Sequence, residues 1–316
     1  MSTATDSLAA EHQALTERCG LVDRSERGKL ALTGAEAKEF LHGQVTNDVE
    51  GLLPGRGCYA AFLTHKGKML GDLRILDLGD ELFLDTERVA LQELFNMIRR
   101  YKLGRDVELH KRTVERGLLS LVGPGAREAT GAEALGPDEH DNADAELAGV
   151  PVRLVITADG VDVICDSART AAVKAALAGV PEVSEAAAEV VRVEAGRPRY
   201  GIDLDDSVIP QEAGLNERAV SFTKGCYVGQ ETVARLFYRG KPNRHLRGLR
   251  LSGPAARGEG LRLGEREVGR LGSSVVSPAH GPIGLALVRR EAAPGDTLAV
   301  GEGSVTATVV ELPFTE

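Results

Sequence analysis

The chain has 316 residues, 42% of them hydrophobic, and a formal net charge of −9. This length fits one large domain or two to three smaller ones, and the hydrophobic content exceeds that of a disordered chain. No run of about 18 apolar residues occurs, so we expect no membrane span. The acidic balance argues against non-specific binding to nucleic acids. The N-terminus is polar and acidic where a signal peptide would be basic and apolar, so we expect a cytoplasmic protein.

Cysteine and histidine spacing gives no metal motif. The four cysteines, Cys19, Cys58, Cys165 and Cys226, are far apart and form no C-x-x-C pair. This spacing argues against a zinc site, and a reducing compartment argues against disulfides. The chain also lacks a phosphate-binding loop, a dinucleotide fingerprint, a nucleophile elbow and an H-E-x-x-H sequence. We therefore expect no metal site, no nucleotide hydrolysis and no dinucleotide oxidoreduction.

The first elements alternate between helical and strand patterns. A short helix is predicted over 7–19, and 20–43 has the pattern of strand, turn, strand and helix. Thr33 precedes Glu36 by three residues, which predicts a capping box at the start of that helix.

Two further elements follow. The segment 57–78 contains two strand-like runs around the turn Lys66-Gly67-Lys68, which predicts a hairpin. Apolar residues at positions 91, 94, 95, 98 and 101 predict one buried face of a helix over 86–102.

A weak repeat links two segments of this region. The pattern L-x-L-x-G-x-x-A-x-E over 30–39 recurs over 119–128, shifted by 89 residues. Both segments have the pattern of a strand, a glycine turn and a helix, which favours a duplicated α+β unit.

The middle of the chain continues the mixed pattern. Residues 136–149 are acidic and lack periodicity, which predicts an exposed loop. A strand pair is predicted over 151–166, a helix over 167–178, and another helix from about 183 to 194.

The pattern changes near residue 245. From there, short apolar runs separated by Gly and Pro indicate a small all-β barrel or sandwich. The chain is therefore predicted to be α+β. We place two interleaved subdomains in residues 1–243 and a C-terminal β domain in residues 244–316.

A basic segment interrupts the acidic sequence. Residues 235–250 contain six Lys or Arg and no acid. They form either a solvated surface or the contact for an anionic ligand such as a carboxylate tail or phosphate.

A glycine-punctuated polar stretch from Arg192 to Arg235 carries the candidate chemistry. Glu194 is either a surface ion-pair partner of Arg197 or Arg199, or a carboxylate that recognises an amino-pyrimidine edge. Cys226 is either a small buried hydrophobe or a reactive thiol.

Lys224-Gly-Cys-Tyr-Val-Gly-Gln-Glu231 resembles the signature of YgfZ-type folate-binding proteins, which share a superfamily with the glycine-cleavage T-protein aminomethyltransferase. The resemblance extends to GAEAKEFLHGQVTNDV at 34–49, THKGKMLGDLR at 64–74 and EAGRPRYGIDLDDSVIPQEAGL at 194–215. It covers most of residues 20–240 and, more loosely, the C-terminal β domain.

The resemblance implies a ring of three subdomains around a central funnel that binds tetrahydrofolate or a one-carbon derivative. It also implies that Glu194 contacts the pteridine and that Cys226 serves in assembly or repair of iron–sulfur clusters in transient client proteins. Lys224 would tune this thiol. The residues expected to contact the cofactor are Glu194, Arg192, Tyr200, Lys224, Gln230 and Arg235.

The shared folate block and one surviving aspartate are the basis of a second hypothesis. T-proteins carry an acidic pair after the glycine hairpin, and this chain has Gly71-Asp72 there. Asp72 is then the candidate catalytic carboxylate of a folate-dependent aminomethyltransferase or demethylase. A third alternative is a scaffold of the same fold that binds no folate.

Overall fold

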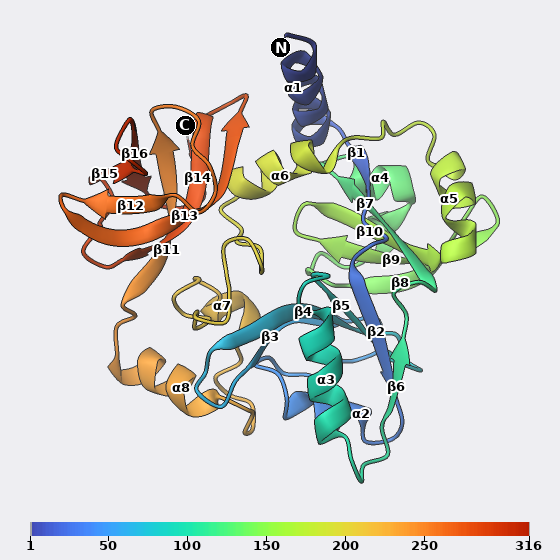
Figure 1. Cartoon of the computed structure of the whole chain (residues 1–316). Helices are drawn as coiled ribbons and strands as arrows, with labels where there is room; N and C mark the ends of the chain where they lie inside the picture. Colours follow the sequence, from blue (N-terminus) through green and yellow to red (C-terminus); the bar gives the residue numbers. More distant parts are fainter. Residues whose placement is uncertain (1, 316) are drawn as a thin grey trace.

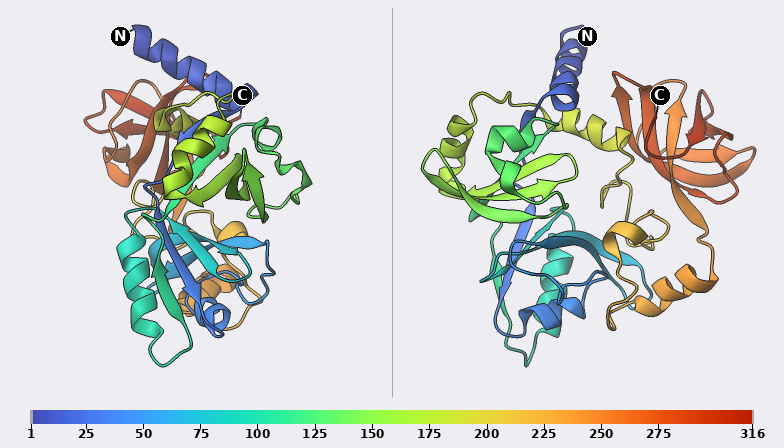
Figure 2. Two further views of the ribbon diagram at one scale, coloured as in Figure 1. Left: turned by 90° about the vertical axis from the view of Figure 1, so that its right-hand side faces the viewer. Right: turned by 180° about the vertical axis from the view of Figure 1, so that it is seen from behind.

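Two five-stranded antiparallel sheets and a closed six-stranded barrel form the chain in the computed structural model, which describes residues 2–315 (Figure 1). The three bodies lie around a common centre, and views from the side and from behind show the same arrangement (Figure 2). The α+β class with a small C-terminal barrel, predicted from the sequence, is confirmed.

The first sheet has the strand order β3-β4-β5-β2-β6. Its strands are β2 (Gly28–Thr33), β3 (Gly57–Leu63), β4 (Met69–Asp77), β5 (Leu82–Thr86) and β6 (Glu108–Lys111). The predicted hairpin is confirmed, since β3 pairs with β4. Two helices, α2 (Ala37–His42) and α3 (Leu91–Tyr101), accompany this sheet.

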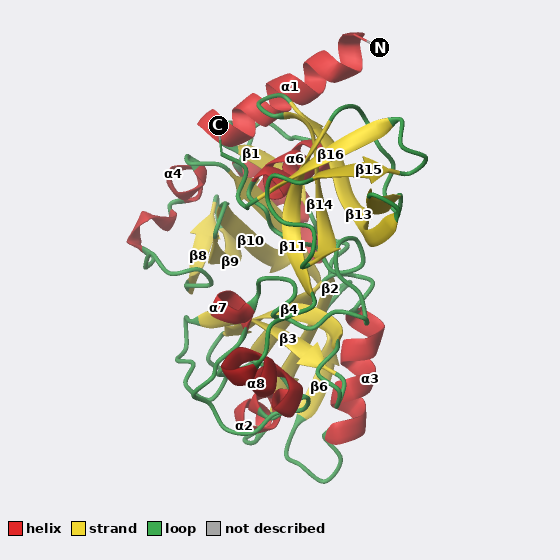
Figure 3. Cartoon of the chain, turned by 90° about the vertical axis from the view of Figure 1, so that its left-hand side faces the viewer, coloured by secondary structure: helices red, strands yellow, loops and turns green. Residues whose placement is uncertain are grey.

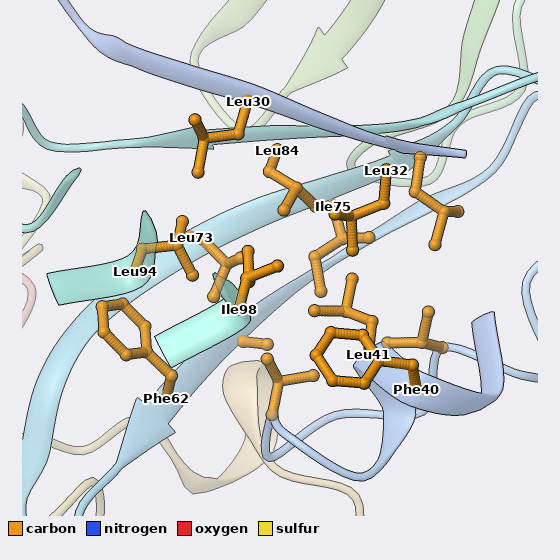
Figure 4. Packing of buried hydrophobic residues seen from close by; sticks show 14 of the residues in the cluster. Leu30, Leu32, Phe40, Leu41, Phe62, Leu73, Ile75, Leu84, Leu94 and Ile98 are labelled. Atoms are coloured by element: carbon orange, nitrogen blue, oxygen red, sulfur yellow. The ribbon is translucent and has the colours of Figure 1, made fainter. Parts of the chain in front are cut away.

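The core of the first body lies between this sheet and its helices (Figure 4). Phe40 and Leu41 from α2 and Leu94 and Ile98 from α3 are at most 2% exposed and pack on strand residues such as Ile75. Burying each such side chain contributes about 1.5–3 kcal/mol. The prediction for α3 was wrong at its end, because Tyr101 is 50% exposed.

The second sheet has the order β1-β7-β10-β9-β8. Its strands are β1 (Gly20–Asp23), β7 (Arg116–Val122), β8 (Asn142–Leu147), β9 (Val150–Thr157) and β10 (Gly160–Asp166). The accompanying helices are α4 (Ala126–Thr130), α5 (Thr170–Ala176) and the short 3-10 helices Ala132–Ala134 and Ser167–Arg169. The predicted strand pair over 151–166 is confirmed as β9 and β10.

The two sheets share one arrangement. In the first sheet, β3, β4 and β5 are neighbours, β2 pairs with β5, and β6 forms the edge beside β2. In the second sheet, β8, β9 and β10 are neighbours, β7 pairs with β10, and β1 forms the edge beside β7. The edge strand β1 runs on into β2 of the other sheet, and β6 runs on into β7. The chain thus crosses twice between the bodies, through residues 24–27 and 112–115.

Matching glycine turns follow β2 and β7. Gly34 has φ +105° and Gly123 has φ +124°, a backbone region that favours glycine. A Cβ on Gly34 would lie 2.3 Å from the Asp106 carbonyl oxygen, and one on Gly123 would lie 2.7 Å from that of Arg18. These turns let α2 and α4 begin directly after their strands.

A shared apolar cluster joins the two sheets. Leu76 and Phe83 of the first sheet meet Leu118, Val155 and Ile164 of the second, each at most 6% exposed. The bodies are therefore packed together rather than tethered by linkers alone.

The barrel is closed in the order β11-β14-β13-β12-β15-β16. Its strands are β11 (Arg244–Leu251), β12 (Gly260–Leu263), β13 (Arg266–Ser277), β14 (Gly281–Arg289), β15 (Thr297–Val300) and β16 (Val305–Val310). Helix α6 (Glu185–Glu194) joins it to the rest, since Val193 packs on Ile283, Leu285 and Phe314. Helix α1 (Ser2–Glu17) packs on α6 through Leu15.

The chain between α6 and the barrel packs on the first sheet. It contains α7 (Asn216–Ala219) and α8 (Gln230–Arg239). Leu204, Leu215 and Val233 from this segment form an apolar cluster with Ala61 and Met69 of the hairpin.

Two local predictions were wrong. The capping box does not form: Thr33 is the last residue of β2, where it pairs with β6, and its hydroxyl bonds to His110 Nε2 at 2.8 Å. Residues 136–149 are only partly a loop, because they include β8 and bury His140 to 3% exposure. Strand β8 alternates half-buried Ala143, Ala145 and Leu147 with exposed Asp144 and Glu146, but this pattern is short and mostly alanine, so the acidic residues hid it.

Candidate active site between the two sheets

A pocket opens where the two sheets meet the segment that follows α6. Seven arginines, five carboxylates and two tyrosines contribute most of its polar lining. These residues are Arg24, Arg27, Tyr59, Asp72, Arg74, Glu87, Glu139, Asp159, Asp162, Arg192, Arg197, Arg199, Tyr200 and Arg218. Three of the residues predicted as functional are among them: Asp72, Arg192 and Tyr200.

Asp72 has the chemistry of an acid–base group. It lies on β4 directly after Gly71, and its side chain reaches the pocket while only 6% of the residue is exposed. Burial raises the pKa of Asp72 to about 6, the hydrogen bond from Tyr59 opposes this, and the nearby charge of Glu87 adds to it. A carboxyl group with such a pKa can take up and release a proton near neutral pH.

Tyr59 orients this carboxyl group. Its hydroxyl donates a hydrogen bond of 2.6 Å to Asp72 Oδ2. Within residues 2–315, Asp72 Oδ1 accepts no hydrogen bond, and it is not among the fully enclosed atoms. One carboxyl oxygen is therefore held by the protein and the other is open to the pocket.

Arginine–carboxylate pairs neutralise much of the pocket wall. Arg74 lies 2.6 Å from Asp85 and 2.5 Å from Asp162, and Arg27 lies 2.8 Å from Asp85. Although burial opposes ionisation of Asp85, the two guanidinium groups lower its pKa to about 2. Arg218 forms a two-point contact with Glu139, and its guanidinium lies 4.5 Å from the Tyr59 ring centre.

Arg192 lines the pocket but has no donor left for a ligand. Its Nε and Nη2 each donate a hydrogen bond to Glu189, and its Nη1 donates one to Asp203 at 3.0 Å. The remaining two hydrogen bonds go to the Arg197 carbonyl and the Ser273 hydroxyl. Because a guanidinium has five N–H donors, all are used. Arg192 therefore has no free N–H for the ligand contact that was expected of it. Its side chain instead connects α6 to barrel strand β13.

Tyr200 supplies an aromatic wall. Burial raises the pKa of Tyr200 to about 12, so its phenol stays neutral at ordinary pH. Its ring packs against the apolar clusters on both sides of the first sheet.

Glu194 does not line the pocket. It is the last residue of α6, and its carboxylate contacts His12 Nε2 at 2.9 Å and accepts a 2.5 Å hydrogen bond from Ser277. The carboxylate thereby links α1, α6 and the barrel. The expected ion pairs with Arg197 or Arg199 are also wrong, because those arginines pair with Asp159 and with Glu185.

The predicted thiol lies in a second place, where three of the resembling segments converge. Cys226 is exposed on the loop before α8. The backbone of this loop bonds to the end of α2, through Val228 N and the Gly43 carbonyl at 3.3 Å. Gly229 also packs against the hairpin turn so closely that a Cβ on it would lie 2.5 Å from the Thr64 carbonyl oxygen.

Lys224 anchors this loop rather than contacting the thiol. Its ammonium donates to the carbonyl oxygens of Val45 at 2.8 Å, Asn47 at 2.9 Å and His42. Burial lowers the pKa of Lys224 to about 8, against the raising effect of Asp48. All three acceptors lie at the last residue of α2 or just after it, so Lys224 holds the loop against the end of that helix.

Gln230 and Arg235 also lie outside the pocket. Gln230 begins α8, and its side-chain oxygen accepts a hydrogen bond of 3.3 Å from Tyr227 N, which orders the loop. Arg235 is exposed on α8. In the rest of the basic segment, Arg244 pairs with Glu212 and Arg247 with Glu311, so these charges are already matched.

Sequence reasoning missed Tyr59, Arg74, Glu139 and Arg218. A signal for Arg74 was present, because Asp72 and Arg74 stand two residues apart on one face of strand β4. Tyr59 reaches the pocket from β3, Glu139 from a loop and Arg218 from the short helix α7, and their convergence depends on long-range packing.

The residues that the structure describes contain neither a membrane-spanning helix nor a metal site. No helix within 2–315 is both long and apolar enough to cross a membrane. In the same range, no group of three or more His, Cys, Asp or Glu side chains is arranged to hold a metal ion.

Comparison with known proteins defines the class. The GCVT N-terminal domain matches residues 1–224, and the glycine cleavage T-protein C-terminal barrel domain matches residues 244–316. The chain therefore belongs to the glycine cleavage T-protein (GCVT) family.

Particular relatives agree with this. The chain is 30% identical to an aminomethyltransferase of Rubrobacter xylanophilus, over 97% of this chain and 86% of the relative. It is 29% identical to a chloroplastic "putative transferase" of Arabidopsis thaliana, over 93% and 71%. The glycine cleavage system aminomethyltransferase T of Bartonella henselae superposes with a TM-score of 0.86 over 98% of this chain and 90% of that protein, at 24% identity, which shows the same fold.

Proposed function

We propose that the pocket between the sheets binds tetrahydrofolate or a one-carbon derivative, and that the chain transfers a one-carbon unit there as an aminomethyltransferase or demethylase. The observation that carries this proposal is Asp72, a buried carboxyl group with a pKa of about 6 and one oxygen open to the pocket. The 30% identity to an aminomethyltransferase supports the same reaction class.

The lining residues fit a reduced folate. The pteridine ring of this cofactor combines flat faces with an edge of N–H donors. Tyr59 and Tyr200 offer aromatic faces, and Asp72 Oδ1 offers a free acceptor. The guanidinium groups around the pocket are already paired with carboxylates of its wall, so the proposal concerns the ring and assigns no residue to the glutamate tail.

Tetrahydrofolate, when bound, supplies a nitrogen that accepts the one-carbon unit. The chain supplies the proton transfer: ionised Asp72 takes up a proton at Oδ1, while Tyr59 holds Oδ2 and keeps the carboxylate in one orientation. Arg218, lying over the Tyr59 ring and paired with Glu139, fixes the phenol in place.

Asp72→Asn tests the reaction directly. The variant keeps the shape of the side chain but cannot take up the proton, so turnover of an aminomethyl donor with tetrahydrofolate should fall about 100-fold or more. Glu194→Gln is the matched control, because Glu194 does not line the pocket and its loss should leave turnover per folded molecule near the wild-type value. Equal turnover by Asp72→Asn and the wild type would reject the assignment of Asp72.

Cys226 supports a second candidate function. Cys226 is exposed, whereas Cys19 and Cys165 are buried and Cys58 is half-buried. An exposed thiol on a loop held by Lys224 fits the YgfZ-type role inferred from the motif, in which a cysteine assists assembly or repair of iron–sulfur clusters in client enzymes. In this function the cluster is cargo, and Cys226 acts as a transient ligand or thiol partner.

Complementation separates the two functions. In cells that lack the native protein, Cys226→Ser should fail to restore the activity of a cluster-dependent enzyme, while the control Cys165→Ser should restore it. Asp72→Asn tests in the same cells whether the pocket is also needed. Full restoration by Cys226→Ser would remove the thiol function and leave the transfer reaction as the account of the chain.

A further inference from the structure

Helix α8 carries an exposed aromatic and basic surface beside the Cys226 loop. We define the α8 surface by Phe222, Phe237, Tyr238, Arg235 and Arg239. In Figure 1 the helix lies at the left edge of the first body, below the barrel, and seen from that side it faces the viewer in front of the first body (Figure 3). The site between the sheets uses none of these residues.

The three rings of this surface are packed on one another, and two of them are exposed while Phe222 is half-buried. Phe222 and Phe237 stack with centroids 3.8 Å apart and planes at 16°, and Tyr238 meets Phe237 edge-on at 5.0 Å. Phe237 is 46% exposed and Tyr238 is 66% exposed. Within α8, Val233 is the residue with a buried side chain, so the helix needs no exposed aromatics for its own packing. Clustered exposed aromatics of this kind mark interaction sites.

The charges of this surface are unmatched. Among residues 2–315, no carboxylate lies at ion-pair distance from Arg235, Arg239 or the neighbouring Lys241. The arginines of the central pocket, by contrast, are paired with carboxylates. A chain of net charge −9 therefore presents a local basic patch here, and an acidic partner would complement it.

We propose that the α8 surface docks an acidic segment of a partner protein that carries an aromatic or aliphatic anchor. The rings would bury the anchor, and Arg235, Arg239 and Lys241 would pair with its flanking carboxylates. Phe222 and Cys226 are four residues apart in sequence. That length of chain spans at most about 14 Å, so the docked segment lies within reach of the thiol.

A protein segment fits better than the other occupants of such a surface. Single-stranded nucleic acid also uses arginines and aromatic faces, but it needs a basic groove along its backbone. Here the basic patch is short, and Glu231 is exposed on the same helix in a strongly acidic chain.

The test uses a fluorescein-labelled synthetic peptide in which glutamates flank a phenylalanine, titrated with the full-length protein by fluorescence anisotropy. A peptide with lysines in place of the glutamates and a labelled oligothymidine serve as comparison probes. The variants are Phe237→Ala with Tyr238→Ala, and Arg235→Glu with Arg239→Glu. The matched control is Arg99→Glu with Arg100→Glu, which reverses two exposed arginines at the end of α3.

The proposal expects the acidic peptide to bind, and each α8 double variant to weaken binding at least tenfold. The α3 control should leave binding unchanged, and added salt should weaken the wild-type interaction. Equal binding of both peptides, no binding of the acidic peptide, or tighter binding of the oligothymidine through the same residues would overturn it. Tetrahydrofolate binding measured on the same variants should be unchanged, so failure here is distinct from failure of the folate pocket.

Discussion

At the residue scale, the function proposed here depends on how burial and one hydrogen bond set the protonation of Asp72. In the sequence this carboxylate stands beside Gly71 and two residues before Arg74, and the resemblance alone made it a candidate. Its partner Tyr59 lies on the neighbouring strand, where pairing with β4 brings the phenol to the carboxyl group. The Asp72–Tyr59 contact is a product of strand register, which a residue-by-residue view of the sequence does not provide.

Tyr59→Phe should move the pH dependence of turnover. The hydrogen bond from Tyr59 lowers the pKa of Asp72, so its removal raises that pKa above about 6. Because ionised Asp72 is the active form, the rise of activity with pH should then occur at higher pH than in the wild type. Tyr200→Phe is the control, since Tyr200 donates no hydrogen bond to Asp72 within 2–315, and its profile should not shift. A wild-type profile for Tyr59→Phe would contradict the assignment.

His140 should make the protein sensitive to acid. Its φ is +75°, it is 3% exposed, and within the described chain neither ring nitrogen has a hydrogen-bond partner. Burial lowers the pKa of His140 from 6.5 to about 4. Between those two values the unfolded chain binds a proton that the folded chain does not, so stability rises with pH through this window, by up to about 3 kcal/mol.

His140→Asn checks this, because asparagine tolerates a positive φ and does not titrate. Denaturant unfolding at several pH values between 4 and 6.5 should show a flatter stability profile for this variant. His65→Asn, at an exposed histidine, should keep the wild-type slope. An unchanged slope in His140→Asn would show that another group causes the acid sensitivity.

At the element scale, the structure brings together segments that the sequence lists separately. The end of α2, the hairpin turn and the loop before α8 each resemble a family motif, and here they pack on one another. Gly67 and Gly229 make this contact possible, since a Cβ on Gly67 would lie 2.8 Å from Thr232 Cβ. The glycines were visible in the sequence, but the contact between them depends on tertiary packing.

Gly229→Ala should destabilise the protein more than a typical glycine substitution at positive φ. Gly229 has φ +85°, and its Cβ would meet the Thr64 carbonyl oxygen, a backbone atom that cannot turn aside. We expect a loss of roughly 2–3 kcal/mol in the free energy of unfolding.

Gly131→Ala is the matched control, since Gly131 has φ +70° but open space around its Cβ position. It should cost about 1 kcal/mol, the backbone term alone. Equal losses in the two variants, measured by denaturant unfolding, would show that the contact at Gly229 relaxes freely.

Elements with strong periodicity were predictable, and those stabilised mainly by pairing were not. The hairpin β3–β4, the strands β9 and β10 and helix α6 have clear apolar patterns, and the structure confirms them. Strand β8 is an edge strand whose apolar side consists of Ala143, Ala145 and Leu147, all only half-buried, so its period-two pattern is weak within an acidic segment. Thr33 and Glu36 have the spacing of a capping box, but Thr33 lies in strand β2 and pairs with β6, because tertiary pairing outweighs a local capping preference.

At the scale of the whole molecule, the barrel is held by a few polar and apolar contacts around α6. Val193 supplies the apolar contact, while Arg192 and Glu194 reach Ser273 and Ser277 of barrel strand β13. The sequence assigned Arg192 and Glu194 to the ligand through a resemblance. Their position at the junction depends on how three bodies meet, which no local pattern encodes.

Arg192→Met should weaken this junction. The substitution removes five hydrogen bonds and leaves the buried Asp203 without its guanidinium partner, which costs about 3–5 kcal/mol for a buried pair. Limited proteolysis should then cut near the barrel faster than in the wild type. Arg99→Met, at an exposed arginine, should show no change. Wild-type stability of Arg192→Met would mean that apolar packing alone holds the barrel.

The measurement that tests the central claim most directly is an anaerobic calorimetric titration with tetrahydrofolate. It compares the wild type with Ala158→Trp, which places a large ring in the pocket lining, and with Ala178→Trp, at an exposed residue outside that lining. The account predicts that the wild type and Ala178→Trp bind alike and that Ala158→Trp binds at least tenfold more weakly, a loss of about 1.4 kcal/mol or more. No binding by the wild type, or equal binding by Ala158→Trp, would contradict a folate site between the two sheets.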